Sequence, residues 1–193
     1  MAALLSKTTL VTGASRGIGR ATASALAAAG AHVVVHYGRS AQDAESLVAD
    51  IRSKEGRADA IQADLGTPDG ATLLAKEVRS IVGERLDVLV SNAGISKAAT
   101  IKDHTVEDFD NLFATNVRSP FFLVQQLLPV LGEGSNIIVI CARRNWEARS
   151  GQPFGPCLCL DQRGIRDARQ ILGRHSWAAR RTRKCNRARR NRH

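Results

Sequence analysis

The sequence predicts an α/β fold of the Rossmann type, in which a parallel sheet is doubly wound by helices. Short β-branched runs alternate with longer amphipathic runs through the first 140 of the 193 residues, and a glycine-rich turn separates the first run of each kind. Strict alternation of strands and helices implies parallel strands, right-handed crossovers and helices on both faces of the sheet.

The expected elements follow one another along the chain. Residues 8–12 (TTLVT) form a β-branched run typical of a buried strand, and residues 16–30 are predicted to form a helix that closes at Gly30. Further strands are expected at 31–37, 58–64, 86–94 and 135–140, and further helices at 41–56, 68–83 and 105–132.

The glycine-rich turn predicts a dinucleotide site. Ligands of such sheets bind at the carboxyl ends of the strands, and residues 12–19 (TGASRGIG) follow the first strand with glycines at the spacing G-x-x-x-G-x-G. These glycines let the backbone turn sharply and let a pyrophosphate approach the helix N-terminus, where unpaired N–H groups and the helix dipole favour anions. The alternative is a glycine-rich turn that binds no ligand.

The end of the second strand indicates which dinucleotide is bound. An acidic residue there would accept a hydrogen bond from the ribose 2′-OH of NAD, whereas a basic residue accommodates the 2′-phosphate of NADP. Residues 36–40 (HYGRS) offer Arg39 and no acid, and Arg16 lies in the glycine-rich turn. We therefore expect NADP(H) rather than NAD(H), unless both arginines are merely solvated.

Four motifs in a fixed order resemble those of one family. They are TGASRGIG from Thr12, ADL from Ala63, SNAG from Ser91 and NVRSPFFLVQ from Asn116. Over residues 7–140 the chain resembles the short-chain dehydrogenase/reductase family, in the subgroup that includes the β-ketoacyl carrier-protein reductases. The resemblance implies NADP(H)-dependent hydride transfer between the nicotinamide and a carbonyl or alcohol substrate. Members are usually homo-oligomers, and whether this chain is one is left open.

The resemblance also implies site residues. Asp64 would hydrogen-bond the adenine with Leu65 beside it, and Asn116 matches the asparagine that helps to hold the family's catalytic lysine and its proton-relay water. The other implied cofactor contacts are Gly13, Ser15, Arg16, Gly17, Ile18 and Gly19 along the phosphates, and Asn92, Ala93 and Gly94 on the adenosine side. The structural alternatives are a turn acid for Asp64 and satisfied buried backbone groups for the two asparagines.

The family's other catalytic residues have no counterpart in the sequence. After the fifth strand the family has a serine that hydrogen-bonds the substrate carbonyl, then a tyrosine with a lysine four residues on, which lowers the tyrosine pKa. Here Cys141 and Ala142 follow Ile140, and the one tyrosine of the chain is Tyr37. Only Asn116 of the catalytic set is matched, so the chain as written is expected to be catalytically weak or inactive.

Residues 141–193 differ in composition from the rest. The net charge of +10 arises there, because residues 1–140 contain 13 Lys and Arg against 15 Asp and Glu, whereas the tail contains 15 against 3. All four cysteines and both tryptophans also lie in the tail. The sequence thus predicts an NADP(H)-binding Rossmann domain at 1–140 and a basic tail at 141–193 that is disordered or poorly packed.

A shift of the reading frame after about Ile140 accounts for this tail. One permitted set of codons for residues 157–164 (CLCLDQRG), read one nucleotide later, gives Ala-Tyr-Ala-Ser-Thr-Lys-Gly, which resembles the family's catalytic helix. The Rossmann sheet would then be truncated after its fifth strand. We expect the strands at 86–92 and 136–140 to lack cover on one face as a result.

Other functions of the tail stay open. Its arginines could bind nucleic acid, although it has neither interleaved aromatic platforms nor a recognisable module. Its cysteines and histidines could bind zinc, but no paired C-x-x-C spacing occurs, and we expect no metal. The chain is therefore interpreted as an oxidoreductase by resemblance, with a nucleotide-binding pseudoenzyme and a nucleic-acid binder as alternatives.

The sequence also bears on location. It has no apolar run long enough to span a membrane, and its first residues (MAALLSK) do not form a signal peptide. We therefore expect a cytoplasmic protein.

Overall fold

Five parallel strands form one sheet in the order β3-β2-β1-β4-β5. The computed structural model describes residues 3–97 and 102–141, so the predictions made for the tail beyond Cys141 lie outside the described residues. The strands are β1 (Thr8–Val11), β2 (His32–Tyr37), β3 (Arg57–Gln62), β4 (Val88–Ser91) and β5 (Asn136–Val139). All four pairings in the sheet are parallel, as the alternation of elements predicts.

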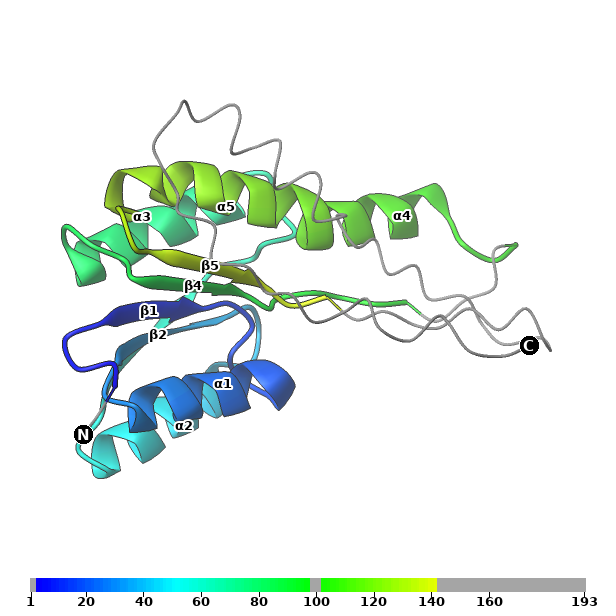
Figure 1. The fold of residues 1–193 in the computed structure, drawn as a ribbon. Helices are drawn as coiled ribbons and strands as arrows, with labels where there is room; N and C mark the ends of the chain where they lie inside the picture. Colours follow the sequence, from blue (N-terminus) through cyan, green and yellow to red (C-terminus); the bar gives the residue numbers. More distant parts are fainter. Residues whose placement is uncertain (1–2, 98–101, 142–193) are drawn as a thin grey trace, which may run out of the picture. The chain divides into compact units, whose positions relative to one another are not determined.

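Helices cover both faces of this sheet (Figure 1). They are α1 (Gly17–Ala28), α2 (Ala41–Ser53), α3 (Gly70–Val82), α4 (Val106–Phe113) and α5 (Ser119–Leu127). The first two pack on one face, and α3 and α5 pack on the other. The doubly wound Rossmann fold expected from the sequence is thereby confirmed. None of these helices in the described part of the chain is both long and apolar enough to cross a membrane.

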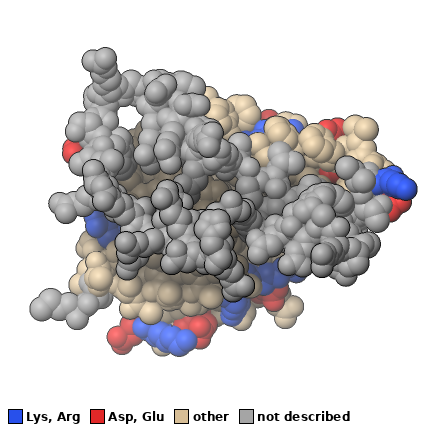
Figure 2. Space-filling model, turned by 45° about the vertical axis from the view of Figure 1, so that its right-hand side comes forward, with Lys and Arg blue, Asp and Glu red and all other residues tan. Residues whose placement is uncertain are grey.

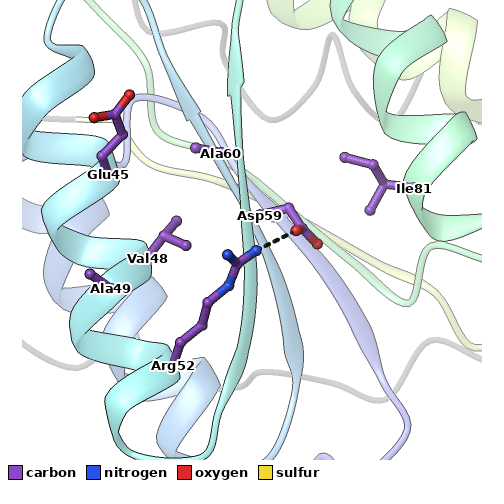
Figure 3. A pocket seen from close by; sticks show the side chains of 7 residues that line it. All are labelled: Glu45, Val48, Ala49, Arg52, Asp59, Ala60 and Ile81. Carbon is purple, nitrogen blue, oxygen red and sulfur yellow. Dashed lines mark hydrogen bonds and ion pairs between the residues drawn. The ribbon is translucent and has the colours of Figure 1, made fainter.

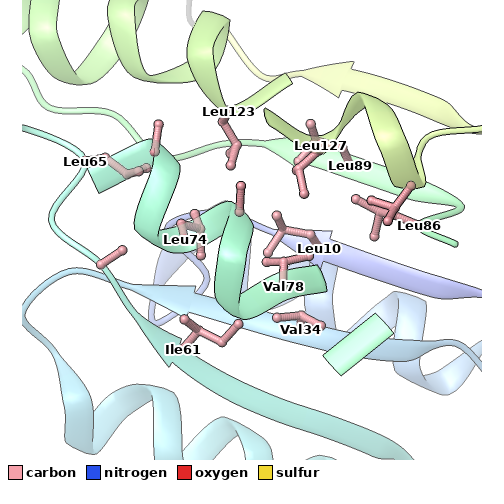
Figure 4. Close-up of a cluster of buried hydrophobic side chains, with 14 residues drawn as sticks. Leu10, Val34, Ile61, Leu65, Leu74, Val78, Leu86, Leu89, Leu123 and Leu127 are labelled. Carbon is pink, nitrogen blue, oxygen red and sulfur yellow. The ribbon is translucent and has the colours of Figure 1, made fainter. Parts of the chain in front are cut away.

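Successive residues of the inner strands are buried on opposite faces. Leu10 and Leu89 belong to the core under α3 and α5, whereas their neighbours Val11 and Val90 belong to the core under α1 and α2. Figure 4 shows the first of these cores, where Leu123 of α5 lies over the sheet. Because both faces are covered, neighbouring positions of these strands are apolar, rather than only every second one.

The two strands expected to lack cover differ from each other. In β4, Leu89 and Val90 are 0% and 1% exposed, so the expectation is wrong for this strand, which lies between β1 and β5 and is covered by helices on both faces. In β5, which forms one edge of the sheet, the apolar residues Ile137 and Ile138 are 42% and 46% exposed. The expected loss of cover is therefore confined to β5.

The helix expected at 105–132 is interrupted. Between α4 and α5 the backbone forms a π-helical turn, η1 (Ala114–Arg118), and a short 3₁₀ turn, η2 (Leu128–Val130), follows α5. Pro120 has no N–H to donate to the carbonyl of Asn116, and its ring would crowd that carbonyl in a regular α-helix. A widened turn relieves this crowding, and such π turns are frequent at functional sites.

At the opposite end of the sheet, Asp87 joins the starts of β1 and β4. Its Oδ1 accepts hydrogen bonds from Lys7 Nζ at 2.9 Å and from Arg85 Nε at 2.8 Å, and its Oδ2 accepts one from the Thr8 N–H at 3.0 Å. Burial raises the pKa of Asp87, but the hydrogen bonds of Arg85, Thr8 and Lys7 outweigh burial and lower the pKa from 3.8 to about 2. The carboxylate is thus ionised and fully partnered.

Replacing this carboxylate is expected to destabilise the fold. Asp87→Ala leaves the Thr8 N–H without its acceptor and should lower the free energy of unfolding by about 1–3 kcal/mol in urea denaturation at pH 7. Because the folded-state pKa lies below the ordinary value, the stabilisation is complete above pH 3.8 and is lost as the pH falls from 3.8 towards 2. The control is Asp50→Ala, which removes an exposed pair with Lys54 and should cost under about 1 kcal/mol. Equal losses in the two variants would contradict the assignment.

Candidate functional site

The candidate site lies where the order of the strands reverses. The chain passes from β1 outward through β2 to β3, then returns to β4 on the other side of β1. Crossovers therefore leave the carboxyl ends of β1 and β4 in opposite directions, which opens a crevice between them in folds of this type. The glycine-rich turn joins β1 to α1 at this end of the sheet (Figure 1).

Two side chains join the ends of β1 and β4. Asn92 Nδ2 donates to the carbonyl oxygens of Thr12 at 2.9 Å and of Gly13 at 3.1 Å. In return, Thr12 Oγ1 accepts from the N–H groups of Asn92 and Ala93, both at 2.9 Å. The peptide groups at the ends of these two strands are thus hydrogen-bonded across the crevice. Asn92 therefore satisfies backbone groups, which is the structural alternative considered for it, and it does so at the centre of the site.

The first and third glycines of the motif are required by close packing. Gly13 has φ +62°, and a Cβ there would lie 2.8 Å from the Cα of Ala93. A Cβ on Gly19 would press on the carbonyl oxygen of Gly13 and lie 2.5 Å from Asn92 Nδ2. Real Cβ atoms do not approach so closely, so these two glycines let the start of α1 pack against the ends of β1 and β4.

The N–H groups along the turn fall into two sets. Those of Thr12, Gly13 and Ala14 are taken up by Val90 O, by His36 Nδ1 and by His36 O at 2.9, 3.1 and 2.8 Å. For the next five, from Ser15 to Gly19, no residue of the described ranges accepts a hydrogen bond. The turn therefore changes at Ser15 from a fixed part of the sheet to a row of available donors.

The start of α1 is suited to an anion. No side chain caps it, and its first turn holds no acidic residue, whereas α4 begins with a capping box of Thr105 and Asp108. Free N–H groups and an uncompensated helix dipole both attract negative charge. The residues present thus fit a phosphate group held along Ser15 to Gly19, where Arg16, Gly17 and Ile18 are also exposed.

Two cations lie at this end of the sheet. Arg16 is the residue immediately before α1, and Arg39 follows β2; both are exposed, and neither pairs with an acid among residues 3–97 and 102–141. No acid stands at the end of β2 to bind a ribose hydroxyl. Two unneutralised arginines are available for a phosphate there.

Asp64 and Leu65 follow β3 with different surroundings. Asp64 is exposed, and its Oδ1 accepts from the Gly66 N–H at 2.8 Å, which is the turn-acid geometry. Its second carboxylate oxygen has no hydrogen-bond partner in the described part of the chain. Leu65 is buried in the core under α3 and α5. The carboxylate remains available to a ligand, while Leu65 serves packing.

Asn116 is held by the chain that follows β4. Its Oδ1 accepts from the Ile95 N–H and its Nδ2 donates to the Ile95 carbonyl, both at 2.9 Å. A Cβ added to Gly94 would lie 3.2 Å from the same Oδ1. The side chain thus braces the segment after Ala93 against the π-helical turn, with one hydrogen bond at each end of its amide.

Sequence reasoning did not find two residues that shape the site. His36 accepts from the glycine-rich turn and contacts the end of β3, and Arg118 Nη2 donates to the carbonyl of Gly66 at 2.7 Å. A histidine within the apolar run VVVHY was the available signal for the first. Nothing in the local sequence signals the second, because its partner lies 52 residues away.

A hollow of about 690 Å³ lies elsewhere, over β3 (Figure 3). It is lined by Glu45, Val48, Ala49, Arg52, Asp59, Ala60 and Ile81. Its arginine and aspartate pair with each other at 2.7 Å, so their charges are already neutralised. None of the lining residues belongs to the crevice, and within the described ranges no cluster of three metal-ligating side chains occurs.

Comparison with known proteins identifies the family. The short chain dehydrogenase model matches residues 7–152. The match begins where the resemblance noted in the sequence begins and extends twelve residues beyond Ile140. Versicolorin reductase stcU of Emericella nidulans is 44% identical over 133 residues, which are 69% of this chain and 50% of the relative. Trihydroxynaphthalene reductase of Colletotrichum orbiculare is 39% identical over 139 residues, 72% and 49% of the two chains. The chain spans about half the length of these curated relatives.

Solved structures agree with this assignment. The angucycline C-6 ketoreductase LanV with bound NADP superposes with a TM-score of 0.70 at 41% identity, covering 72% of this chain and 56% of that one. A short chain dehydrogenase from Burkholderia cenocepacia J2315 in complex with NADP gives 0.68 at 42% identity, covering 71% and 56%. The matched motifs, the fold and the crevice together show that this chain belongs to the short-chain dehydrogenase family.

Proposed function

We propose that residues 1–140 form an NADP(H)-binding Rossmann domain and that the crevice between β1 and β4 is its binding site. The observation that carries the proposal is the row of five N–H donors from Ser15 to Gly19, which begins where the fixed part of the turn ends. Asn92, Ala93 and Gly94 would flank the adenosine side, and the free oxygen of Asp64 would meet the adenine.

NADP(H) is proposed over NAD(H) for two reasons. Arg16 directly precedes α1 and Arg39 follows β2, so both could contact a 2′-phosphate. No acidic residue stands at the end of β2 to bind the ribose 2′-OH of NAD instead. The two solved relatives described above were crystallised with NADP, at 41% and 42% identity. Both considerations support the same cofactor.

The reaction of the domain's family would be hydride transfer between this nicotinamide and a carbonyl or alcohol substrate. The bound cofactor would supply the hydride, and the protein must supply a proton donor at the substrate oxygen. Asn116 is the family's catalytic residue that this chain retains, and both ends of its amide are bound to Ile95. We propose that the 193-residue chain binds the dinucleotide without reducing ketones, as a pseudoenzyme. The reading-frame shift and the cytoplasmic location stay predictions.

The charge of the described part does not favour nucleic acid as the partner. Residues 1–140 carry 13 basic against 15 acidic side chains. Lys and Arg are interspersed with Asp and Glu on the described surface visible in Figure 2. Nucleic-acid binding needs a basic face to neutralise phosphates. The dinucleotide is therefore preferred as the ligand of this domain.

The packing of Gly19 provides the first test. Gly19→Ala should weaken NADPH binding at least tenfold in a fluorescence titration, because the added methyl must displace the Gly13 carbonyl or Asn92 Nδ2. Gly132→Ala is the matched control, since its Cβ would lie 3.4 Å from the flexible end of Arg85, away from the crevice. Unchanged NADPH affinity in the Gly19 variant would show that the cofactor binds elsewhere.

Cofactor choice is tested through Arg39. Charge-assisted contacts with phosphate contribute roughly 1.5–3 kcal/mol, so Arg39→Ala should weaken NADPH binding about tenfold or more and leave NADH binding unchanged. Arg57→Ala, which removes an exposed charge at the start of β3, should change neither affinity. Equal binding of NADPH and NADH by the unmodified chain would refute the preference.

Catalysis is tested by following NADPH oxidation with a panel of ketones. A positioned acid typically contributes about 10²–10⁴ in rate, and no tyrosine other than Tyr37 is present to act as one, so we expect no measurable turnover. The comparison protein is the product of the same DNA read one nucleotide later after Ile140, which should be active. Robust turnover by the 193-residue chain, purified free of host reductases, would refute both the inactivity and its explanation.

A further inference from the structure

We propose that His36 is a positioning residue for the dinucleotide, an imidazole that holds the start of the glycine-rich turn against the ends of β2 and β3. The inference rests on the proposed function, because it assigns the residue that shapes the same site. It concerns a side chain on β2 that none of the matched motifs contains.

His36 makes three hydrogen bonds to the two loops that flank the crevice. Its Nδ1 accepts from the Gly13 N–H at 3.1 Å, and its own carbonyl accepts from the Ala14 N–H at 2.8 Å. Its Nε2 lies 3.0 Å from the carbonyl oxygen of Ala63, the residue before Asp64. One side chain thus connects the turn expected to hold the phosphates with the segment expected to meet the adenine.

These partners determine the state of the ring. Because an N–H of Gly13 donates to Nδ1, that nitrogen carries no proton, so Nε2 carries it and donates to Ala63. The residue is 2% exposed, and this burial lowers the pKa of His36 from 6.5 to about 4, against a smaller opposite effect of the bond to Ala63. A neutral ring with a single tautomer is therefore the form present at neutral pH.

The contact with Gly13 determines which N–H groups are left for a ligand. Asn92 holds the carbonyls of Thr12 and Gly13 from the β4 side, and His36 holds the N–H groups of Gly13 and Ala14 from the β2 side. Both sides of the turn are thus fixed up to Ala14, and the free donors begin at the next residue. Without the imidazole, the Gly13 N–H would lack an acceptor. The peptide groups of the turn could then rotate, and the free N–H groups that begin at Ser15 would no longer be aligned.

Substitutions of His36 by side chains of different length can test its hydrogen bonds to Gly13 and to Ala63 one at a time. Asparagine carries an acceptor at the δ position, like Nδ1, and can keep the bond to Gly13 but cannot reach Ala63. Glutamine has its amide at the ε position and can reach Ala63 instead. Phenylalanine fills a similar volume and makes neither bond. The three variants therefore distinguish the two hydrogen bonds from simple packing.

The experiment measures the dissociation constant for NADPH by fluorescence titration at pH 7.5 in the full chain and in His36→Asn, His36→Gln and His36→Phe. Each is measured well below its own melting temperature. We expect His36→Asn to bind within about threefold of the unmodified chain, and His36→Gln and His36→Phe to bind at least tenfold more weakly. A merely structural histidine would lower melting temperatures without producing this order of affinities.

Each outcome decides the matter. If His36→Phe folds and binds NADPH as tightly as the unmodified chain, the positioning role is wrong. If that variant does not fold, His36→Gln binding as well as His36→Asn overturns it. Failure of the unmodified chain to bind NADPH would instead refute the proposed function, and the positioning role with it. Nitrogen-15 NMR of labelled histidine checks the tautomer independently, and a protonated Nδ1 at pH 7.5 would contradict the hydrogen bond from Gly13.

Discussion

The side-chain amide of Asn92 donates hydrogen bonds to the carbonyl oxygens of Thr12 and Gly13. The hydroxyl oxygen of Thr12 accepts hydrogen bonds from the two N–H groups that follow β4. Paired strands end here, so their last peptide groups have lost their ladder partners and would be costly to bury alone. The exchange between the two side chains supplies those partners. It holds the ends of β1 and β4 together just beyond their paired residues, where Gly19 and the start of α1 pack and where the crevice lies.

Charged groups are paired at one end of the sheet and unpaired at the other. At the amino ends of β1 and β4, Asp87 is buried with two cations and a backbone N–H, so its charge is neutralised within the protein. At the carboxyl ends, two arginines and a row of N–H groups lack a counter-charge among the described residues. Partial charges that the protein leaves unpaired in one place are available to a ligand there. The asymmetry indicates stability at one end and binding at the other.

The interrupted helix links this crevice to the rest of the fold. The π-helical turn at Ala114–Arg118 presents Asn116 to Ile95 on one side and Arg118 to Gly66 on the other. The segments after β3 and β4 are therefore both tied to the same turn. Because these loops carry Asp64 and Gly94, the turn holds two parts of the candidate site at once, and its geometry follows from Pro120.

The order of strands and helices, the parallel sheet, the glycine-rich turn and the family could all be predicted from the sequence. These follow from local patterns, since β-branched runs, amphipathic periodicity and glycine spacing act over a few residues. The interruption at Asn116 could also have been predicted, because Pro120 lies four residues after it.

The pairing of polar groups that are distant in the sequence could be seen only in the folded structure. His36 and Gly13 are 23 residues apart, Thr12 and Asn92 are 80 apart, and Arg118 and Gly66 are 52 apart. The same is true of the cover of β4 on both faces and the exposure of β5 at the edge, because burial depends on which strands and helices become neighbours. Hydrogen bonds and burial across such separations arise from the folded arrangement of the chain. Local sequence patterns do not contain that arrangement, which is why the role of His36 became visible only in the structure.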